Sequence, residues 1–168
     1  MKKKILGMDA LEVSELCLGS MTWGTQNSKT EAFEQIDMAL DYNVNFIDTA
    51  EMYPVNPLSK ETQGNSEKII GEWLSKSKRR TDLVIATKVS GKGYQAVRNG
   101  DDISKNSIKI AVENSLKNLK TDYIDLYQLH WPNRGSYMFR QNWTFDPSNQ
   151  ITDEALSHFR EVLEVIEE

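Results

Sequence analysis

Residues 45–53 read Asn45-Phe46-Ile47-Asp48-Thr49-Ala50-Glu51-Met52-Tyr53, an apolar run that ends in a carboxylic acid and leads on to a phenol. Two later runs have a similar design: residues 83–88 end in Lys88, and residues 125–132 carry His130 before Trp131-Pro132. These runs resemble strands and the segments between them helices, and in a (β/α) barrel the ends of neighbouring strands converge on one face. The pattern therefore predicts that Asp48, Lys88 and His130 meet there. Tyr53 is expected on the loop just above them.

The order of elements predicts four strand–helix units behind a short N-terminal hairpin within residues 5–18. The hairpin leads into a first barrel strand at residues 15–18, and the runs described above supply the other three strands. Helices are expected near residues 29–42 and from residues 65, 104 and 152 onward, the first behind a Ser28/Glu31 capping box. This order indicates the α/β class and a parallel (β/α) barrel of the TIM type.

The length of 168 residues is short for a complete barrel, which takes roughly 250 residues. We therefore expect residues 1–168 to form a single, partial barrel domain that covers about the first four units. In such a half barrel the first and fourth strands are open edges, which allow self-association. The last helix carries an apolar stripe that is expected to pack on the core: Ala155, Leu156, Phe159, Val162, Leu163 and Ile166.

Composition excludes several classes of function. A formal net charge of -5 argues against a nucleic-acid-binding surface, which needs clustered basic residues. No apolar run reaches 18 residues, so no membrane span is expected. The single cysteine, Cys17, rules out an internal disulfide, and one cysteine with two histidines makes a metal site improbable. The expectation is a cytoplasmic protein that binds no metal, nucleic acid or membrane.

The four residue types at the predicted cleft suit the reduction of a carbonyl group. A phenol keeps its proton at neutral pH and can donate it to an oxygen that is becoming an alkoxide. A nearby ammonium group favours the phenolate and so should lower the phenol's pKa, and a carboxylate keeps that ammonium charged and aimed. A neutral imidazole can orient the carbonyl oxygen. Because none of these groups supplies a hydride, a nicotinamide cofactor is implied.

The chain resembles the amino-terminal half of an aldo-keto reductase. The resemblance rests on four segments in order: Leu16-Cys17-Leu18-Gly19-Ser20-Met21-Thr22-Trp23-Gly24, Asp48-Thr49-Ala50-Glu51-Met52-Tyr53, Thr87-Lys88 and Leu129-His130-Trp131-Pro132. The long loop containing Pro54 and Pro57 is most similar to a bacterial subgroup related to the potassium-channel β-subunit branch. The family's catalytic tetrad of Asp, Tyr, Lys and His matches Asp48, Tyr53, Lys88 and His130.

The resemblance implies an NADP-dependent oxidoreductase that converts small aldehydes or ketones to alcohols, with Tyr53 as proton donor. In relatives the loop after the first strand contacts the cofactor, which implies Ser20, Met21 and Gln26, with Asp48 near the nicotinamide ribose. The family's later strands supply a Ser-Asn pair, a Gln, a stacking ring and a basic segment for the 2′-phosphate. Nothing in this chain matches them. The alternative is a truncated or non-catalytic half barrel retained as an interaction protein.

Structural roles compete with the catalytic interpretation at several positions. Asp48 could cap the turn after its strand, Lys88 could be an ordinary strand-end lysine, and His130 could be a core histidine. Packing at the barrel mouth is the alternative to cofactor contact for Met21 and Trp23. Gln128 shares the inward face with His130 by strand alternation, and we interpret it as structural.

Overall fold

The computed structural model describes residues 1–8, 11–133 and 143–167. Its strands are β1 Lys3–Leu6, β2 Leu11–Ser14, β3 Cys17–Gly19, β4 Phe46–Asp48, β5 Val84–Val89 and β6 Leu126–Leu129. Its α-helices are α1 Lys29–Asp41, α2 Asn65–Ser77, α3 Lys105–Leu119 and α4 Thr152–Glu167, and three short 3-10 turns lie at Arg80–Asp82, Arg98–Gly100 and Pro147–Asn149. The predicted hairpin is confirmed as the antiparallel pair β1–β2.

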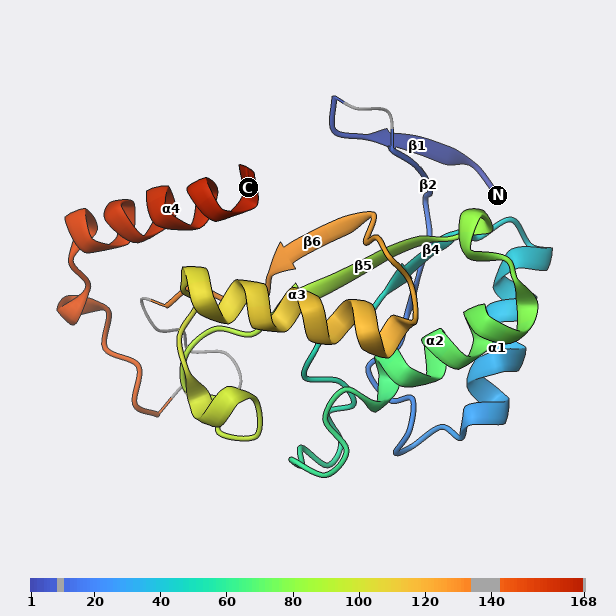
Figure 1. Ribbon diagram of the computed structural model, residues 1–168, viewed down its shortest axis with the longest axis horizontal. Helices are drawn as coiled ribbons and strands as arrows, with labels where there is room; N and C mark the ends of the chain where they lie inside the picture. The colour runs from blue at the N-terminus through green and yellow to red at the C-terminus, as the bar shows by residue number, and fades with distance from the viewer. Residues whose placement is uncertain (9–10, 134–142, 168) are drawn as a thin grey trace.

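The other four strands form one parallel sheet in the order β3-β4-β5-β6. Adjacent strands in space are adjacent in sequence, and helices connect β3 to β4, β4 to β5 and β5 to β6 (Figure 1). This is the strand–helix repeat of a TIM-type barrel, present here as a half barrel. The register aligns Gly19 with Asp48 and Asp48 with Ala86, so the strands end close to one level.

Helices α1, α2 and α3 follow one another along one side of this sheet (Figure 1). The main core lies between them and the strands and includes Ile36, Ile47, Ile70 and Ile85, each nearly inaccessible to solvent. Helices α2 and α3 pack closely at Gly71, where an added Cβ would lie 2.1 Å from the carbonyl oxygen of Asn118. The core therefore holds the outer face of the sheet rigidly and leaves the inner face for chemistry.

The observed helix N-termini agree in part with those expected from the sequence. Ser28 and Glu31 form the predicted capping box of α1, and Ser104 caps α3 through the backbone of Ser107. The N-cap of α2 is Gly64, in the left-handed conformation with φ 78°, and it makes no side-chain cap hydrogen bond. Neither Asn65 nor Ser66, the two residues after Gly64, caps α2 through its side chain. The Ser66 hydroxyl instead donates to the Ser20 and Trp23 carbonyl oxygens, which pins the loop after β3.

Helix α4 buries less of its surface than its apolar stripe predicts. Only Val162 and Val165 are buried, and they pack with α3 residues such as Ile108. The remaining large members of the stripe are about half exposed: Leu156, Phe159, Leu163 and Ile166. The reason is that α4 contacts the rest of the described chain along one edge, beside α3, and lies at the β6 end of the half barrel (Figure 1).

Two features are absent from residues 1–8, 11–133 and 143–167. No helix there has the length and apolar character needed to cross a bilayer. No group of three or more His, Cys, Asp or Glu side chains is arranged there to hold a metal ion.

Candidate active site

The structure brings together the four residues that the strand-end pattern singles out. Asp48 is the last residue of β4, Lys88 lies near the end of β5, and His130 directly follows β6. Tyr53 lies in the loop after β4, where its backbone N–H donates to Ala50 and closes a turn. The sheet register places these strand ends side by side, so residues far apart in sequence face one cleft.

Lys88 is the centre of the site because its ammonium group reaches three oxygen atoms. Its Nζ lies 2.6 Å from Oδ2 of Asp48, 2.6 Å from the Thr49 carbonyl oxygen and 3.4 Å from the Tyr53 hydroxyl oxygen. A lysine ammonium has three donors, and each has an acceptor here. Since Lys88 donates to the phenol oxygen, the phenol's own proton is left to point elsewhere, toward a substrate.

Tyr53 is buried and holds its proton firmly. Burial, followed by the negative charge of Asp48, raises the pKa of the Tyr53 phenol to about 12. The expectation that the ammonium lowers this pKa is not met, because burial and the negative charge of Asp48 both raise it. Tyr53 is therefore a phenol and not a phenolate at neutral pH.

His130 lies against the Tyr53 ring in an edge-to-face arrangement, with ring centroids 5.7 Å apart. Burial, and then the positive charge of Lys88, lower the pKa of the imidazole to about 4, although Asp48 opposes the shift. The ring is therefore neutral at pH 7. A neutral imidazole can hydrogen-bond a carbonyl oxygen without adding a second positive charge beside Lys88.

Gln128 belongs to the site, although the sequence suggested only a structural role. Its Nε2 donates to Oδ1 of Asp48 at 3.1 Å, while Oδ2 of the same carboxylate accepts from Lys88. Gln128 thus fixes the orientation of the carboxylate. The signal for this was strand alternation, which places Gln128 and His130 on one face of β6.

The residues expected to contact a cofactor differ in exposure. The Met21 side chain is 45% exposed and Gln26 is exposed, so both are accessible to a ligand. Ser20 is fully buried, and its hydroxyl donates to the Asp48 carbonyl oxygen at 3.0 Å, so it holds the loop to β4. Trp23 is buried as well, and its indole donates to Gln35, which is a packing role.

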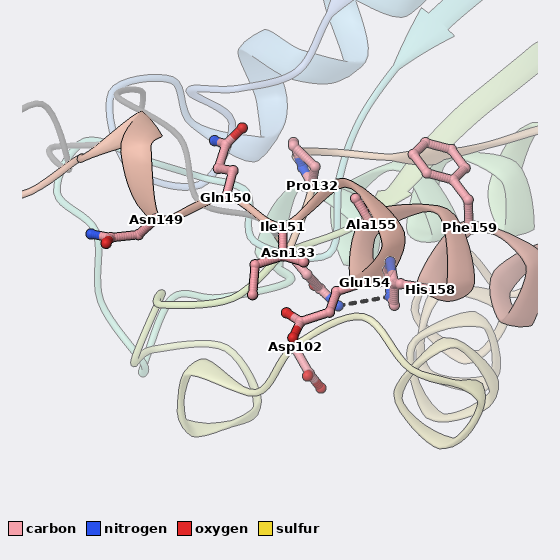
Figure 2. Close-up of a pocket in the computed structure, with 10 residues that line it drawn as sticks. All are labelled: Asp102, Pro132, Asn133, Asn149, Gln150, Ile151, Glu154, Ala155, His158 and Phe159. Atoms are coloured by element: carbon pink, nitrogen blue, oxygen red, sulfur yellow. Dashed lines mark hydrogen bonds between the residues drawn. The ribbon is translucent and has the colours of Figure 1, made fainter.

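A hollow of about 390 Å³ lies beside α4 and is separate from the tetrad (Figure 2). Its lining includes Asp102, Asn133, Glu154 and His158, but none of the four strand-end residues. Asn133 exchanges hydrogen bonds with the Ile103 backbone, and Figure 2 shows its side chain turned toward His158, 2.7 Å away. These bonds join α4 to the loop after β6, which is a structural function.

Comparison with known proteins gives a consistent result. Residues 15–168 match the model of the aldo/keto reductase family. The chain is 46% identical over 141 residues to "Protein tas" of Escherichia coli, which covers 80% of this chain and 40% of that protein. It is 38% identical over 133 residues to the aryl-alcohol dehydrogenase GME11368 of Pestalotiopsis microspora, covering 72% of this chain and 32% of that protein.

The fold has relatives among solved structures. The thermostable aldo-keto reductase Tm1743, solved with the inhibitor epalrestat, superposes with a TM-score of 0.61 and 30% sequence identity. That match covers 98% of this chain and 50% of Tm1743, and the chain spans about 40% of the length of the curated protein tas. With a family match over nearly all of its length and a half barrel of the same architecture, the chain belongs to the aldo/keto reductase family.

Proposed function

We propose that this chain is the proton-donating half of an NADP-dependent oxidoreductase that reduces small aldehydes or ketones to alcohols. The observation that carries the proposal is the position of Lys88 Nζ, 2.6 Å from Asp48 and 3.4 Å from the Tyr53 hydroxyl, with His130 against the Tyr53 ring. We further propose that residues 1–168 form one partial barrel domain in a cytoplasmic protein. Metal, nucleic acid and membrane have no part in this function.

The two candidate proton donors differ in charge state. With a pKa of about 4, only about one His130 in a thousand is protonated at pH 7, so the imidazolium is a poor source of the proton. Tyr53 keeps its proton, and a substrate alkoxide is a much stronger base than a phenolate, so transfer from Tyr53 is downhill. Lys88 then stabilises the phenolate that remains, and Asp48 holds Lys88 in place. His130 orients the carbonyl oxygen.

The residues that the family resemblance assigns to the cofactor suit one end of a dinucleotide. The bound nicotinamide would supply the hydride. Asp48, whose side chain is 31% exposed, can accept hydrogen bonds from ribose hydroxyls, and Met21 offers an apolar surface to the nicotinamide. None of Ser20, Met21, Gln26 and Asp48 carries a positive charge, so they do not provide a phosphate site. The preference for NADP over NAD rests on the family.

Activity of the full-length protein tests the proposal. Purified protein is mixed with NADPH or NADH and a panel of aliphatic and aromatic aldehydes and ketones, and oxidation of the cofactor is followed by its absorbance. We expect carbonyl-dependent oxidation, faster with NADPH. An exposed tyrosine at the C-cap of α1, Tyr42, provides a control: Tyr42→Phe should match the wild type. Absence of carbonyl-dependent oxidation with both cofactors would contradict the proposal.

A second proposal is self-association through the open edges of the half barrel, and the exposure of α4, which lies at the β6 end, favours it. Leu156, Phe159 and Leu163 are each more than half exposed on one amphipathic helix. Burying an apolar side chain of this size is worth about 1.5–3 kcal/mol, which favours any contact that covers the stripe. Such a contact surface on α4 would also serve the alternative function, in which the half barrel is retained for interaction and not for catalysis.

A further inference from the structure

Glu51 is a buried carboxylate that the four-residue site does not use. It lies between Asp48 and Tyr53 in sequence, and only 4% of it is exposed. Its Oε1 accepts from two donors, the backbone N–H of Ser90 and Nη1 of Arg98. The Arg98 side chain is itself 10% exposed, so both members of the ion pair are buried. A buried ion pair needs well-placed hydrogen bonds to offset the cost of desolvation, which suggests a specific role.

The Glu51–Arg98 pair is hydrogen-bonded to the backbone of Ser90, two residues after Lys88. Arg98 Nη2 donates to the Ser90 carbonyl oxygen at 2.8 Å, so Glu51 holds the N–H of the Ser90 residue and Arg98 holds its C=O. The backbone N–H of Glu51 also donates to the Lys88 carbonyl oxygen at 3.3 Å. Glu51 therefore bonds to two alternate residues of the β5 segment, one through its backbone and one through its side chain. This extends the parallel pairing of β4 and β5 beyond the last ladder residues.

The same residue fixes the loop that carries Tyr53. The Glu51 carbonyl oxygen accepts from Gln63 Nε2 at 3.0 Å, and the turn that ends at Tyr53 begins one residue before Glu51, at Ala50. Glu51 is thus bonded to the backbone of Lys88 and also holds the loop that carries Tyr53.

We propose that Glu51 and Arg98 are positioning residues that set the separation between the Lys88 ammonium and the Tyr53 hydroxyl. The inference rests on the proposed function, since it assigns the pair to proton transfer from Tyr53. Without the negative charge of Glu51, Arg98 is left buried and unpaired, and it releases Ser90. The end of β5 can then move away from the loop, and Lys88 with it. Displacements of about 1 Å remote from the chemistry can cost roughly a hundredfold in rate.

The test is a set of variants of the full-length protein: Glu51→Gln, Arg98→Met, Arg98→Lys and the double variant Glu51→Gln/Arg98→Met. Each is assayed for kcat and KM with a carbonyl substrate, for NADPH affinity by fluorescence, and for its thermal midpoint. The matched control is Arg79→Met, which breaks the exposed Arg79–Asp82 ion pair at the turn that precedes β5. The control should behave as the wild type.

We expect Glu51→Gln and Arg98→Met to lower kcat by about ten- to a hundredfold, with KM and the NADPH dissociation constant changed less than about threefold. The double variant should be no worse than the poorer single variant, because the two residues act as one unit. Arg98→Lys keeps the charge and should recover part of kcat. If Glu51→Gln does not fold, the kcat of Arg98→Met, compared with that of Arg98→Lys, decides the matter.

Two results would overturn the inference. One is a folded Glu51→Gln or Arg98→Met protein with wild-type kcat or with a loss confined to KM or NADPH binding. The other is additive losses in the double variant. If Tyr53→Phe is inactive while Glu51→Gln is fully active, only this inference fails. If Tyr53→Phe is fully active, the proposed function fails as well.

Discussion

Lys88 Nζ lies 2.6 Å from Oδ2 of Asp48, although the two residues are forty positions apart and sit on neighbouring strands. The parallel register of β4 and β5 brings them together, and the remaining donors of Lys88 reach Thr49 and Tyr53. The ion pair therefore does more than neutralise charge. It fixes the direction in which the ammonium meets the phenol oxygen, and several measurable consequences follow.

Asp48→Asn should lower stability as well as activity. The substitution leaves the Lys88 ammonium, whose side chain is only 10% exposed, without its counter-charge. Because Asp48 is partly exposed, we expect a loss of about 1–3 kcal/mol in the free energy of unfolding, below the full cost of breaking a buried pair. Urea unfolding measures it. Asp82→Asn breaks an exposed pair and should cost less than about 1 kcal/mol. Equal losses in the two variants would contradict the buried pair.

His130 should make the protein less stable in mild acid. Its pKa is about 4 in the folded state and near 6.5 when unfolded, so between these values the unfolded chain binds the extra proton. Stability from this residue is therefore present above pH 6.5 and is lost as the pH falls toward 4. Between pH 7 and 4.5 the wild type should lose about 2 kcal/mol more unfolding free energy than His130→Asn. Identical pH dependence in urea unfolding would show that His130 titrates normally.

Gln128→Leu should weaken catalysis without abolishing it. The variant removes one hydrogen bond to Oδ1 of Asp48 and leaves the bond from Lys88 to Oδ2. A single hydrogen bond is worth about 0.5–1.5 kcal/mol, so kcat should fall by about two- to tenfold. The exposed Gln95 provides the control, since Gln95→Leu lies away from the carboxylate. An unchanged kcat in Gln128→Leu would return Gln128 to the structural role that the sequence suggested.

The isolated 168-residue chain should self-associate and bind NADPH weakly. The exposed stripe on α4 includes Phe159 and Leu163, and the residues expected at the cofactor carry no positive charge for its phosphates. Light scattering should give a mass above that of one 19.2 kDa chain. The double variant Phe159→Lys/Leu163→Lys should reduce that mass. A monomer that binds NADPH at micromolar concentrations would contradict both expectations.

The sequence predicts the strand ends well because hydrophobic runs and strand polarity are local properties. Asp48, Lys88 and His130 were placed correctly on neighbouring strands from the runs that they end. The Ser28 capping box was predictable for the same reason, whereas the left-handed Gly64 cap depends on how the preceding loop folds. Alternation alone could not show that Gln128 reaches the Asp48 carboxylate across the sheet.

Properties that depend on burial could not be predicted from the sequence. The direction of the Tyr53 pKa shift depends on how much solvent the loop excludes and on the nearby charge of Asp48. The burial of Val84 and Ala86 likewise depends on the fold around them. The Glu51–Arg98 pair joins segments 47 positions apart, and no local pattern relates them.

The decisive measurement is the single-turnover rate of NADPH oxidation by the full-length Tyr53→Phe protein, with NADPH affinity measured in parallel. The variant loses only a hydroxyl, so cofactor affinity should stay within about threefold of wild type. The rate should fall by roughly a hundredfold or more, because the general acid is gone. A Tyr53→Phe protein that binds NADPH normally and reduces the carbonyl at the wild-type rate would show that Tyr53 is not the proton donor.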